Sequence, residues 1–145
     1  SSVSRYSHIE AVAMKVKTIK QRVVIPNAPP EKVYDAYMDS QKHAEVTGAS
    51  ASIDPTVDGR FTAWEGYITG KILELERGKR VVQEWATTEW PEGYGPSRLE
   101  LDFRAVKEGT EITLVQTGVP EEDAVAYDEG WFEFYWGPMT AYFKK

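Results

Sequence analysis

Short alternating segments separated by tight turns restrict the fold of this 145-residue chain more than any other feature. Between residues 51 and 117 the apolar side chains recur with a period of two, which is typical of β-strands. Turn sequences such as Asp58-Gly59 and Glu65-Gly66 separate these segments. Parallel strands need a long crossover between them, and these turns are too short to provide one. The sequence therefore predicts an antiparallel meander.

Another strand and two short helices are expected before the meander. β-Branched residues over Lys15–Ile25 predict the first strand, and the proline-rich segment 26–30 ends it. Proline suits a first helical turn, so we expect two short helices with a kink between them over Pro30–Thr47. The strands expected after these helices are 51–54, 60–64, 67–76, 80–89, 97–106 and 111–117.

Aromatic residues concentrate at the carboxyl end of the chain, where eight of them fall in the last 19 residues. Pro120, followed by three acidic residues, predicts the start of a helix. The large side chains beyond it form a wide stripe at helical spacing. Gly130 and Pro138 lie inside this stripe and should kink or loosen the helix. The stripe consists of Trp131, Phe132, Tyr135, Trp136, Met139, Tyr142 and Phe143.

Composition excludes several classes of function. The chain has no cysteine, which excludes disulfides, thiolate nucleophiles and cysteine metal sites. A net charge of −6 argues against nucleic-acid and anionic-membrane partners, because both require a positive surface. The longest apolar runs are far shorter than the roughly 20 residues of a spanning helix. Ser1–Ala13 also lacks the pattern of a signal peptide, so we expect a cytoplasmic protein.

The first thirteen residues differ from the rest of the chain. They are small and polar with little pattern, so we expect them to be disordered. They are either a leader or cloning remnant before an internal start at Met14, or a frayed native terminus. Residues 14–145 are expected to form a single domain.

The predicted elements define an α+β architecture. A long helix that lies across a curved antiparallel sheet cannot fill the groove at both ends, so a cavity between helix and sheet is expected. Such a cavity would be largely apolar, as pockets for small molecules usually are.

Short motifs in a fixed order connect the chain to a known family. They are Gly59-Arg60-Phe61 with Trp64, Gly66-Tyr67-Ile68-Thr69-Gly70, Val82-Gln83-Glu84-Trp85 with Trp90-Pro91, Gly109-Thr110, Gln116-Thr117-Gly118-Val119-Pro120, and Gly130-Trp131 with Tyr135-Trp136 and Pro138. With these motifs, the chain resembles the START-like (SRPBCC, Bet v 1-like) helix-grip superfamily. Within it, the chain resembles the family of the C-terminal domain of the activator of heat shock protein 90 ATPase. The resemblance covers roughly residues 17–143. It implies a curved sheet of about six or seven strands wrapped on the long C-terminal helix.

Large side chains on the elements that would enclose the cavity are the candidate ligand-binding residues. Each of them is also explained as ordinary core, and a pocket wall can be both. Gln83 shares a strand face with Trp85 and would either satisfy a buried polar group or orient a ligand. The loop 90–96 would be a pocket lid, a partner-binding edge or an ordinary packed loop. The candidates are Tyr34, Met38, Trp64, Tyr67, Gln83, Trp85, Trp131, Tyr135 and Met139.

The sequence provides little basis for catalysis. His8 and His43 have no metal-ligand neighbours, and His43 is expected to be a solvated residue of a polar helix. No nucleophile elbow, dinucleotide fingerprint or phosphate-binding loop is present, so we expect no cofactor and no metal. Arg60 or Glu84 would become a candidate site residue only if it pointed inward. Gly70, inside a predicted strand, is expected to mark a bulge.

Three functions remain open from the sequence. The first is a non-catalytic module that binds a small hydrophobic or amphipathic ligand in the cavity. The second, implied by the resemblance, is a co-chaperone-like domain that contacts heat shock protein 90. In that family ATPase stimulation is implied to need an additional N-terminal domain, which this sequence does not contain. The third is a cyclase- or hydratase-like enzyme, which would require an inward acid or histidine.

Overall fold

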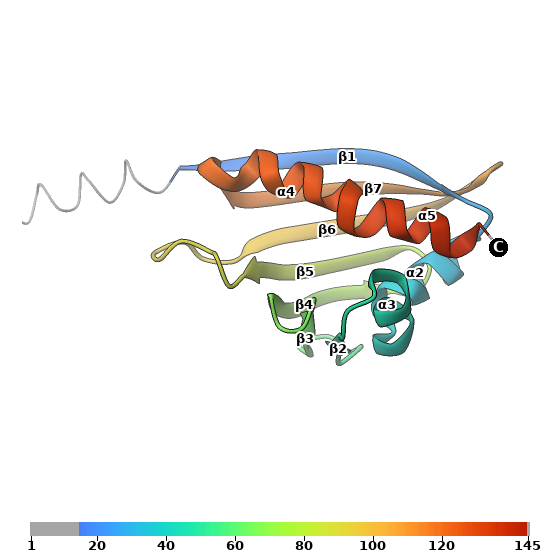
Figure 1. Ribbon diagram of the computed structural model, residues 1–145, viewed down its shortest axis with the longest axis horizontal. Helices are drawn as coiled ribbons and strands as arrows, with labels where there is room; N and C mark the ends of the chain where they lie inside the picture. The colour runs from blue at the N-terminus through green and yellow to red at the C-terminus, as the bar shows by residue number, and fades with distance from the viewer. Residues whose placement is uncertain (1–14, 145) are drawn as a thin grey trace, which may run out of the picture.

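The computed structural model describes residues 15–144, which are built on a seven-stranded sheet. The strand order is β1-β7-β6-β5-β4-β3-β2, and every neighbouring pair is antiparallel. The first strand therefore lies beside the last one (Figure 1). This arrangement confirms the predicted meander. The strands are β1 Val16–Pro26, β2 Ser52–Ile53, β3 Arg60–Ala63, β4 Ile68–Glu76, β5 Arg80–Thr87, β6 Ser97–Val106 and β7 Gly109–Pro120.

Two short helices follow the first strand, as predicted. They are α2 (Pro30–Met38) and α3 (Ser40–Thr47). Asp39 separates them because its backbone is extended, and its carboxylate accepts a hydrogen bond of 3.0 Å from the backbone N–H of Lys42. Gly48 ends α3 in the left-handed conformation, with φ of 80°. The pair packs near the carboxyl end of the long helix (Figure 1).

The long C-terminal helix consists of four consecutive segments. A 3-10 turn, η1 (Glu121–Asp123), leads into α4 (Ala124–Trp131), a π-helical stretch η2 (Phe132–Trp136) and α5 (Gly137–Phe143). In η2 the N–H of Gly137 bonds to the carbonyl of Phe132, five residues back. The wide turn directly precedes Pro138, whose missing N–H and bulky ring disrupt α-helical hydrogen bonding. The predicted loosening at Pro138 is therefore confirmed.

The π-helical stretch changes which side chains face the sheet. Trp131, Tyr135, Trp136 and Met139 are buried, whereas Phe132 is 48% exposed. The expectation that Phe132 belongs to the buried stripe is therefore wrong. A π turn contains more residues than an α turn, so positions counted at α-helical spacing do not all stay on one face.

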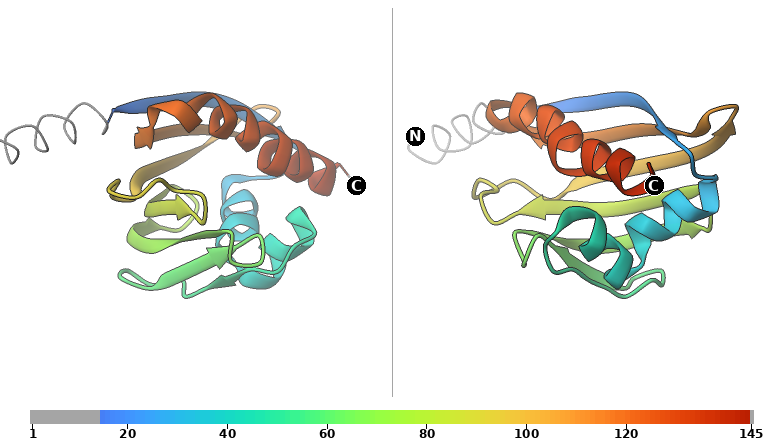
Figure 2. Two further views of the ribbon diagram at one scale, coloured as in Figure 1. Left: turned by 60° about the vertical axis from the view of Figure 1, so that its left-hand side comes forward. Right: turned by 45° about the vertical axis from the view of Figure 1, so that its right-hand side comes forward.

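The sheet bends around the helix, which lies in its concave side (Figure 2). In β4 the pairing with β5 shifts between Ile72 and Glu74, and this irregularity leaves Leu73 as an extra residue. The expectation of a bulge at Gly70 is wrong, because Gly70 pairs in regular register with Phe61 and Trp85. A Cβ at Gly70 would collide with the backbone carbonyl of Glu84. Gly70 therefore serves the close approach of two strands.

The charged strand residues lie on the opposite side of the sheet from the helix. Arg60 is exposed, and Glu84 is half-buried between the outward-facing Lys71 and Arg98 on the neighbouring strands. Neither side chain supplies an inward charge. Within residues 15–144 no helix has the length and apolarity that a membrane span requires. The expectation for residues 1–13 lies outside the described residues.

Candidate functional site

A cavity of about 380 Å³ lies between the first half of the C-terminal helix and strands β3 to β5. Its wall is almost wholly apolar, and seven of the ten lining residues are aromatic. No aspartate, glutamate, lysine or arginine is among them. The lining residues are Trp64, Tyr67, Ile68, Trp85, Ala126, Tyr127, Gly130, Trp131, Phe134 and Tyr135.

The turn between β3 and β4 positions one wall of the cavity. Trp64 and Glu65 both adopt positive φ, at 52° and 58°, and Gly66 follows with φ of 91°. This left-handed run is uncommon for non-glycine residues and turns the chain sharply between Trp64 and Tyr67. The Trp64 ring meets the Phe134 ring edge to face, with centroids 5.4 Å apart. Sheet and helix thus touch at the rim of the cavity.

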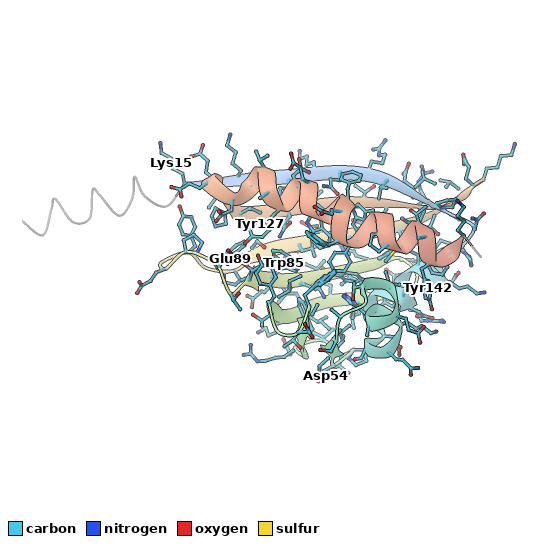
Figure 3. The ribbon with its side chains drawn as sticks, viewed as in Figure 1. Lys15, Asp54, Trp85, Glu89, Tyr127 and Tyr142 are labelled. Atoms are coloured by element: carbon cyan, nitrogen blue, oxygen red, sulfur yellow. The ribbon has the colours of Figure 1, made fainter. Side chains whose placement is uncertain are left out.

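Trp85 forms the floor of the cavity. It lies on β5, is only 4% exposed, and its ring lies within 6.0 Å of the rings of Trp90, Tyr127 and Trp131. Figure 3 shows Trp85 and Tyr127 at one end of the helix, beside the loop that carries Glu89. Tyr142 lies at the opposite end in the same view. The cavity therefore extends from this end of the helix to Tyr135, which lies next to His43 of α3.

Most polar tips of the aromatic wall are bonded to the protein. Trp131 Nε1 donates to Gln116 Oε1 at 2.9 Å. The Tyr127 hydroxyl lies 2.6 Å from Thr87 Oγ1, and the Tyr67 hydroxyl donates to Glu89 at 2.6 Å. Burial, together with the bond to Glu89, raises the pKa of the Tyr67 hydroxyl. The Tyr67 hydroxyl therefore stays neutral, and the bonded polar tips leave an apolar wall.

Beyond the cavity, the helix packs against α2 and α3 through a buried polar chain that begins at the cavity-lining Tyr135. The Tyr135 hydroxyl lies 2.9 Å from His43 Nε2, and His43 Nδ1 lies 2.8 Å from the carbonyl oxygen of Tyr37. A carbonyl only accepts, so Nδ1 carries the hydrogen and Nε2 accepts from Tyr135. The Tyr37 hydroxyl donates to Gln83 Oε1 at 2.8 Å. Tyr135 also lines the cavity together with Trp64, which links this chain to the cavity wall.

The expectation that His43 is solvated is wrong. Its side chain is only 3% exposed because α3 turns it toward Tyr135. Burial lowers its pKa, and the bond to the Tyr37 carbonyl opposes this effect only in part. His43 therefore stays neutral at physiological pH and acts as a core residue behind the cavity wall.

The structure brings five of the nine sequence-predicted site residues together in the cavity: Trp64, Tyr67, Trp85, Trp131 and Tyr135. The other four lie elsewhere. Tyr34 packs edge to face on Phe103, and Gln83 is bonded to Tyr37. Met38 and Met139 are buried and do not line the cavity.

Sequence reasoning did not include Ile68, Ala126, Tyr127, Gly130 and Phe134 among the candidates. Ala126 and Gly130 are small residues one helical turn apart, followed by Phe134 a turn later. Two small residues on one helix face leave space above a sheet. This spacing is the signal in the sequence that could have identified Ala126, Gly130 and Phe134 as lining residues.

The loop 90–96 packs beside the cavity without lining it. Trp90 Nε1 donates to the carbonyl of Gly95 at 2.9 Å, and the Trp90 ring lies 5.6 Å from that of Tyr127. Among residues 15–144 there is no cluster of three acidic or histidine side chains that could hold a metal. The cavity wall provides no carboxylate or imidazole, and its titratable side chains are tyrosines.

A curved antiparallel sheet gripping a long C-terminal helix, with two short helices after the first strand, defines the helix-grip class that also includes Bet v 1-like proteins. Residues 27–144 match the family described as activator of Hsp90 ATPase homolog 1-like protein. The chain belongs to this family.

Relatives and solved structures agree with this assignment. The chain is 28% identical over 116 residues to the activator of 90 kDa heat shock protein ATPase homolog of Dictyostelium discoideum, covering 79% of this chain. It spans only about 30% of the length of the curated relatives that it matches. An HSP90 activator from Plasmodium falciparum, PFC0360w, has the same fold, with a TM-score of 0.74, 23% identity and coverage of 88% and 94%. Ara h 8.0201 also has the same fold, with a TM-score of 0.71 and 13% identity over 89% of this chain and 98% of that protein.

Proposed function

We propose that this chain is a non-catalytic module that binds a small hydrophobic molecule in the cavity between helix and sheet. The observation that carries the proposal is the aromatic cavity of about 380 Å³. This volume lies at the low end of the range for small-molecule sites, and an apolar wall with few polar groups is their usual character.

The wall favours a neutral guest. A buried charge is costly unless an opposite charge or several hydrogen bonds compensate it. The cavity wall has no charged side chain, and the hydroxyls of Tyr67 and Tyr127 are already bonded to Glu89 and Thr87. A neutral ring system would gain contact with the aromatic side chains at no such cost.

The rim offers a way in. Phe134 is 46% exposed, Ala126 is exposed, and Trp64 and Tyr67 are half-buried. A guest that enters here would cover these side chains and remove apolar surface from water. At about 25 cal/mol per Å², that burial is the main source of affinity.

A fluorescence titration with phenylnaphthylamine, a neutral probe that brightens in apolar surroundings, tests the proposal. Gly130→Leu places a side chain into the cavity and should abolish the brightening. Ala141→Leu adds the same bulk at an exposed position of α5 outside the cavity, and should bind as the original chain does. No brightening with the original chain, or an equal signal from Gly130→Leu, would reject the proposal.

A second candidate function is a contact with heat shock protein 90, favoured by the similarity to relatives that are named activators of 90 kDa heat shock protein ATPase. The matched relatives are about three times as long as the matched region, so their whole activity does not transfer to this chain by similarity alone. A titration of the labelled chain with the cognate chaperone tests the contact, and no binding at high micromolar concentration would remove it. A cytoplasmic location stays a prediction.

A further inference from the structure

Strand β1 is a long edge of the sheet, and its outer side is unpaired within residues 15–144. It is the first strand in the sheet order and pairs with β7 on its other side (Figure 1). Among the described residues, no hydrogen bond from outside β7 reaches the backbone of residues 16–26. The opposite edge strand, β2, has only two residues, whereas β1 has eleven. A long edge presents a row of N–H and C=O groups that another extended segment can pair with.

This edge is basic although the chain as a whole is acidic. Residues 15–26 contain three lysines, one arginine and no acid, against a net charge of −6 for the chain. Lys20 and Arg22 are exposed on the face of the sheet opposite the helix. Their neighbours on β7 are the uncharged Val115 and Thr113. Among the described residues, neither Lys20 nor Arg22 has an ion-pair partner.

The flank of the C-terminal helix beside this edge carries exposed apolar side chains. Gln21 of β1 donates to the carbonyl and the carboxylate of Asp128 at 2.8 and 2.6 Å, and accepts from Trp136 Nε1 at 2.8 Å. Phe132 lies four residues from each of these two helix positions, so it shares their flank. Phe132 is 48% exposed, and Val125, one turn before Asp128, is 69% exposed.

The edge and the helix flank together select the pattern of a partner. Successive side chains of a strand point to opposite faces, and they interact with cross-strand neighbours on the same face. A strand added beside β1 would therefore present one set of side chains to Lys20 and Arg22. The alternate set would face the helix flank that carries Val125 and Phe132. Acidic residues suit the first set, and apolar residues suit the second.

We propose that the outer edge of β1 is a docking site for an extended segment of another protein in which acidic residues alternate with apolar ones. The segment adds an eighth strand to the seven-stranded sheet. This site goes beyond the proposed ligand-binding function and lies on the opposite flank of the helix from the cavity, where Phe134 meets Trp64.

The charge of the edge argues against a second copy of this chain as the occupant. Antiparallel pairing of β1 with itself would bring Lys20 and Arg22 of the two copies close together, and like charges opposite each other destabilise a sheet. Lysines on an edge strand discourage such self-pairing. An acidic segment escapes this repulsion and gains attraction instead.

A fluorescein-labelled peptide with the core Glu-Val-Glu-Phe-Glu-Val tests the inference by fluorescence polarisation. Two further versions separate strand pairing from attraction by charge: one is N-methylated at the three glutamates, the other at the three apolar residues. These two sets of N–H groups lie on opposite edges of an extended peptide. We expect one version to lose binding and the other to keep it. In ¹H–¹⁵N spectra the original peptide should move amide signals of residues 17–24.

Variants of the chain test each set of contacts. Lys20→Glu with Arg22→Glu should weaken binding about tenfold or more, because attraction becomes repulsion at two positions. The control, Lys32→Glu with Lys42→Glu, makes the same charge change at exposed positions of α2 and α3 and should bind nearly as the original chain does. Phe132→Ala should weaken binding roughly fivefold. Phe134→Ala, at a side chain of similar exposure on the cavity flank, should leave peptide binding unchanged.

Four outcomes would overturn the inference. The first is no binding of the original peptide. The second is that both N-methylated versions bind as tightly as the original peptide, which would mean adhesion by charge without strand pairing. The third is a dimer in sedimentation that Lys20→Glu with Arg22→Glu alters, which would assign the edge to a second copy. The fourth is binding of phosphatidylserine vesicles that the same variant abolishes, which would assign the edge to a membrane.

Discussion

The C-terminal helix meets the sheet differently at its two ends. Near α2 and α3 the interface is filled, and the hydroxyls of Tyr37 and Tyr135 and the ring of His43 bond to one another or to the protein. Near α4 the interface is hollow, and the ring of Trp85 forms part of the cavity wall. One helix and one sheet thus provide both a packed core and a cavity.

The difference between the two ends shows what fills the groove between the curved sheet and the long helix. At the filled end, two extra helices supply side chains that the curved sheet and the single helix cannot supply. At the hollow end none of the helices within residues 15–144 adds lining residues beyond those of the C-terminal helix, which contributes the small residues Ala126 and Gly130. The predictions below test this contrast between a packed end and a hollow end.

Truncation of a large side chain should separate the two ends most clearly. Met139 is 1% exposed at the filled end, so Met139→Ala should lower the free energy of unfolding by about 2–5 kcal/mol. Phe134 is 46% exposed at the rim of the hollow end, and Phe134→Ala should cost about 1 kcal/mol or less. Urea unfolding followed by circular dichroism measures both. Equal losses would contradict the contrast.

Removing one hydroxyl should give the next largest effect. Tyr37→Phe leaves Gln83 Oε1 without its donor in a buried site and should cost about 1–3 kcal/mol. The double variant Tyr37→Phe with Gln83→Met removes both polar partners and should recover part of that loss. Tyr127→Phe at the half-buried edge of the cavity should cost less. If the double variant is no more stable than Tyr37→Phe alone, the lost hydrogen bond to Gln83 is not the cause of the destabilisation.

The filled end should also give a pH dependence. Burial lowers the pKa of His43 in the folded state below its value near 6.5 in the unfolded chain. At a pH between these two pKa values, the unfolded chain therefore binds more protons than the folded chain does. Stability is therefore complete above about pH 6.5 and falls as the pH decreases, by at most about 1.4 kcal/mol per pH unit. Unfolding at pH 7.5 and 5.5 measures this slope, above the range of most carboxylates. His43→Gln should flatten it, and an unchanged slope would exclude His43 as its source.

The smallest effect concerns two glycines of the same helix. A Cβ at Gly130 would make an ordinary contact of 3.7 Å with Phe134, so Gly130→Ala should raise the free energy of unfolding by about 0.5–1 kcal/mol. A Cβ at Gly137 would lie 3.0 Å from the carbonyl of Phe132 in the π-helical stretch, so Gly137→Ala should show no such gain. Thermal unfolding compares the two. Equal gains in the free energy of unfolding for the two variants would mean that the π-helical stretch adjusts to the added methyl group without cost.

Local patterns in the sequence predicted most of the fold. The period of two and the glycine turns gave the antiparallel strands, and Ser97–Val106 has the predicted bounds. The proline and acidic residues gave the helix starts at Pro30 and at Glu121. These features depend on neighbours in the chain, so the sequence alone determines them.

Other features depended on contacts between distant segments. His43 lies on a helix that reads as polar, yet its ring is buried by Tyr135, 92 residues away. The position of Gly70 inside a strand predicts a bulge, yet its missing side chain allows β5 to lie close to it. The position of the cavity follows from where α2 and α3 fill the groove and from the turn at Trp64.

By itself, the sequence determined the order of the elements, the antiparallel sheet and the aromatic character of the helix, because spacing along the chain encodes them. Only the tertiary structure decided which aromatic rings surround space and which surround each other. It also decided that the buried indole N–H of Trp85 has no acceptor within residues 15–144. Hydrogen-bond partners that lie far apart in the chain are set by how the layers pack, and no local pattern records that geometry.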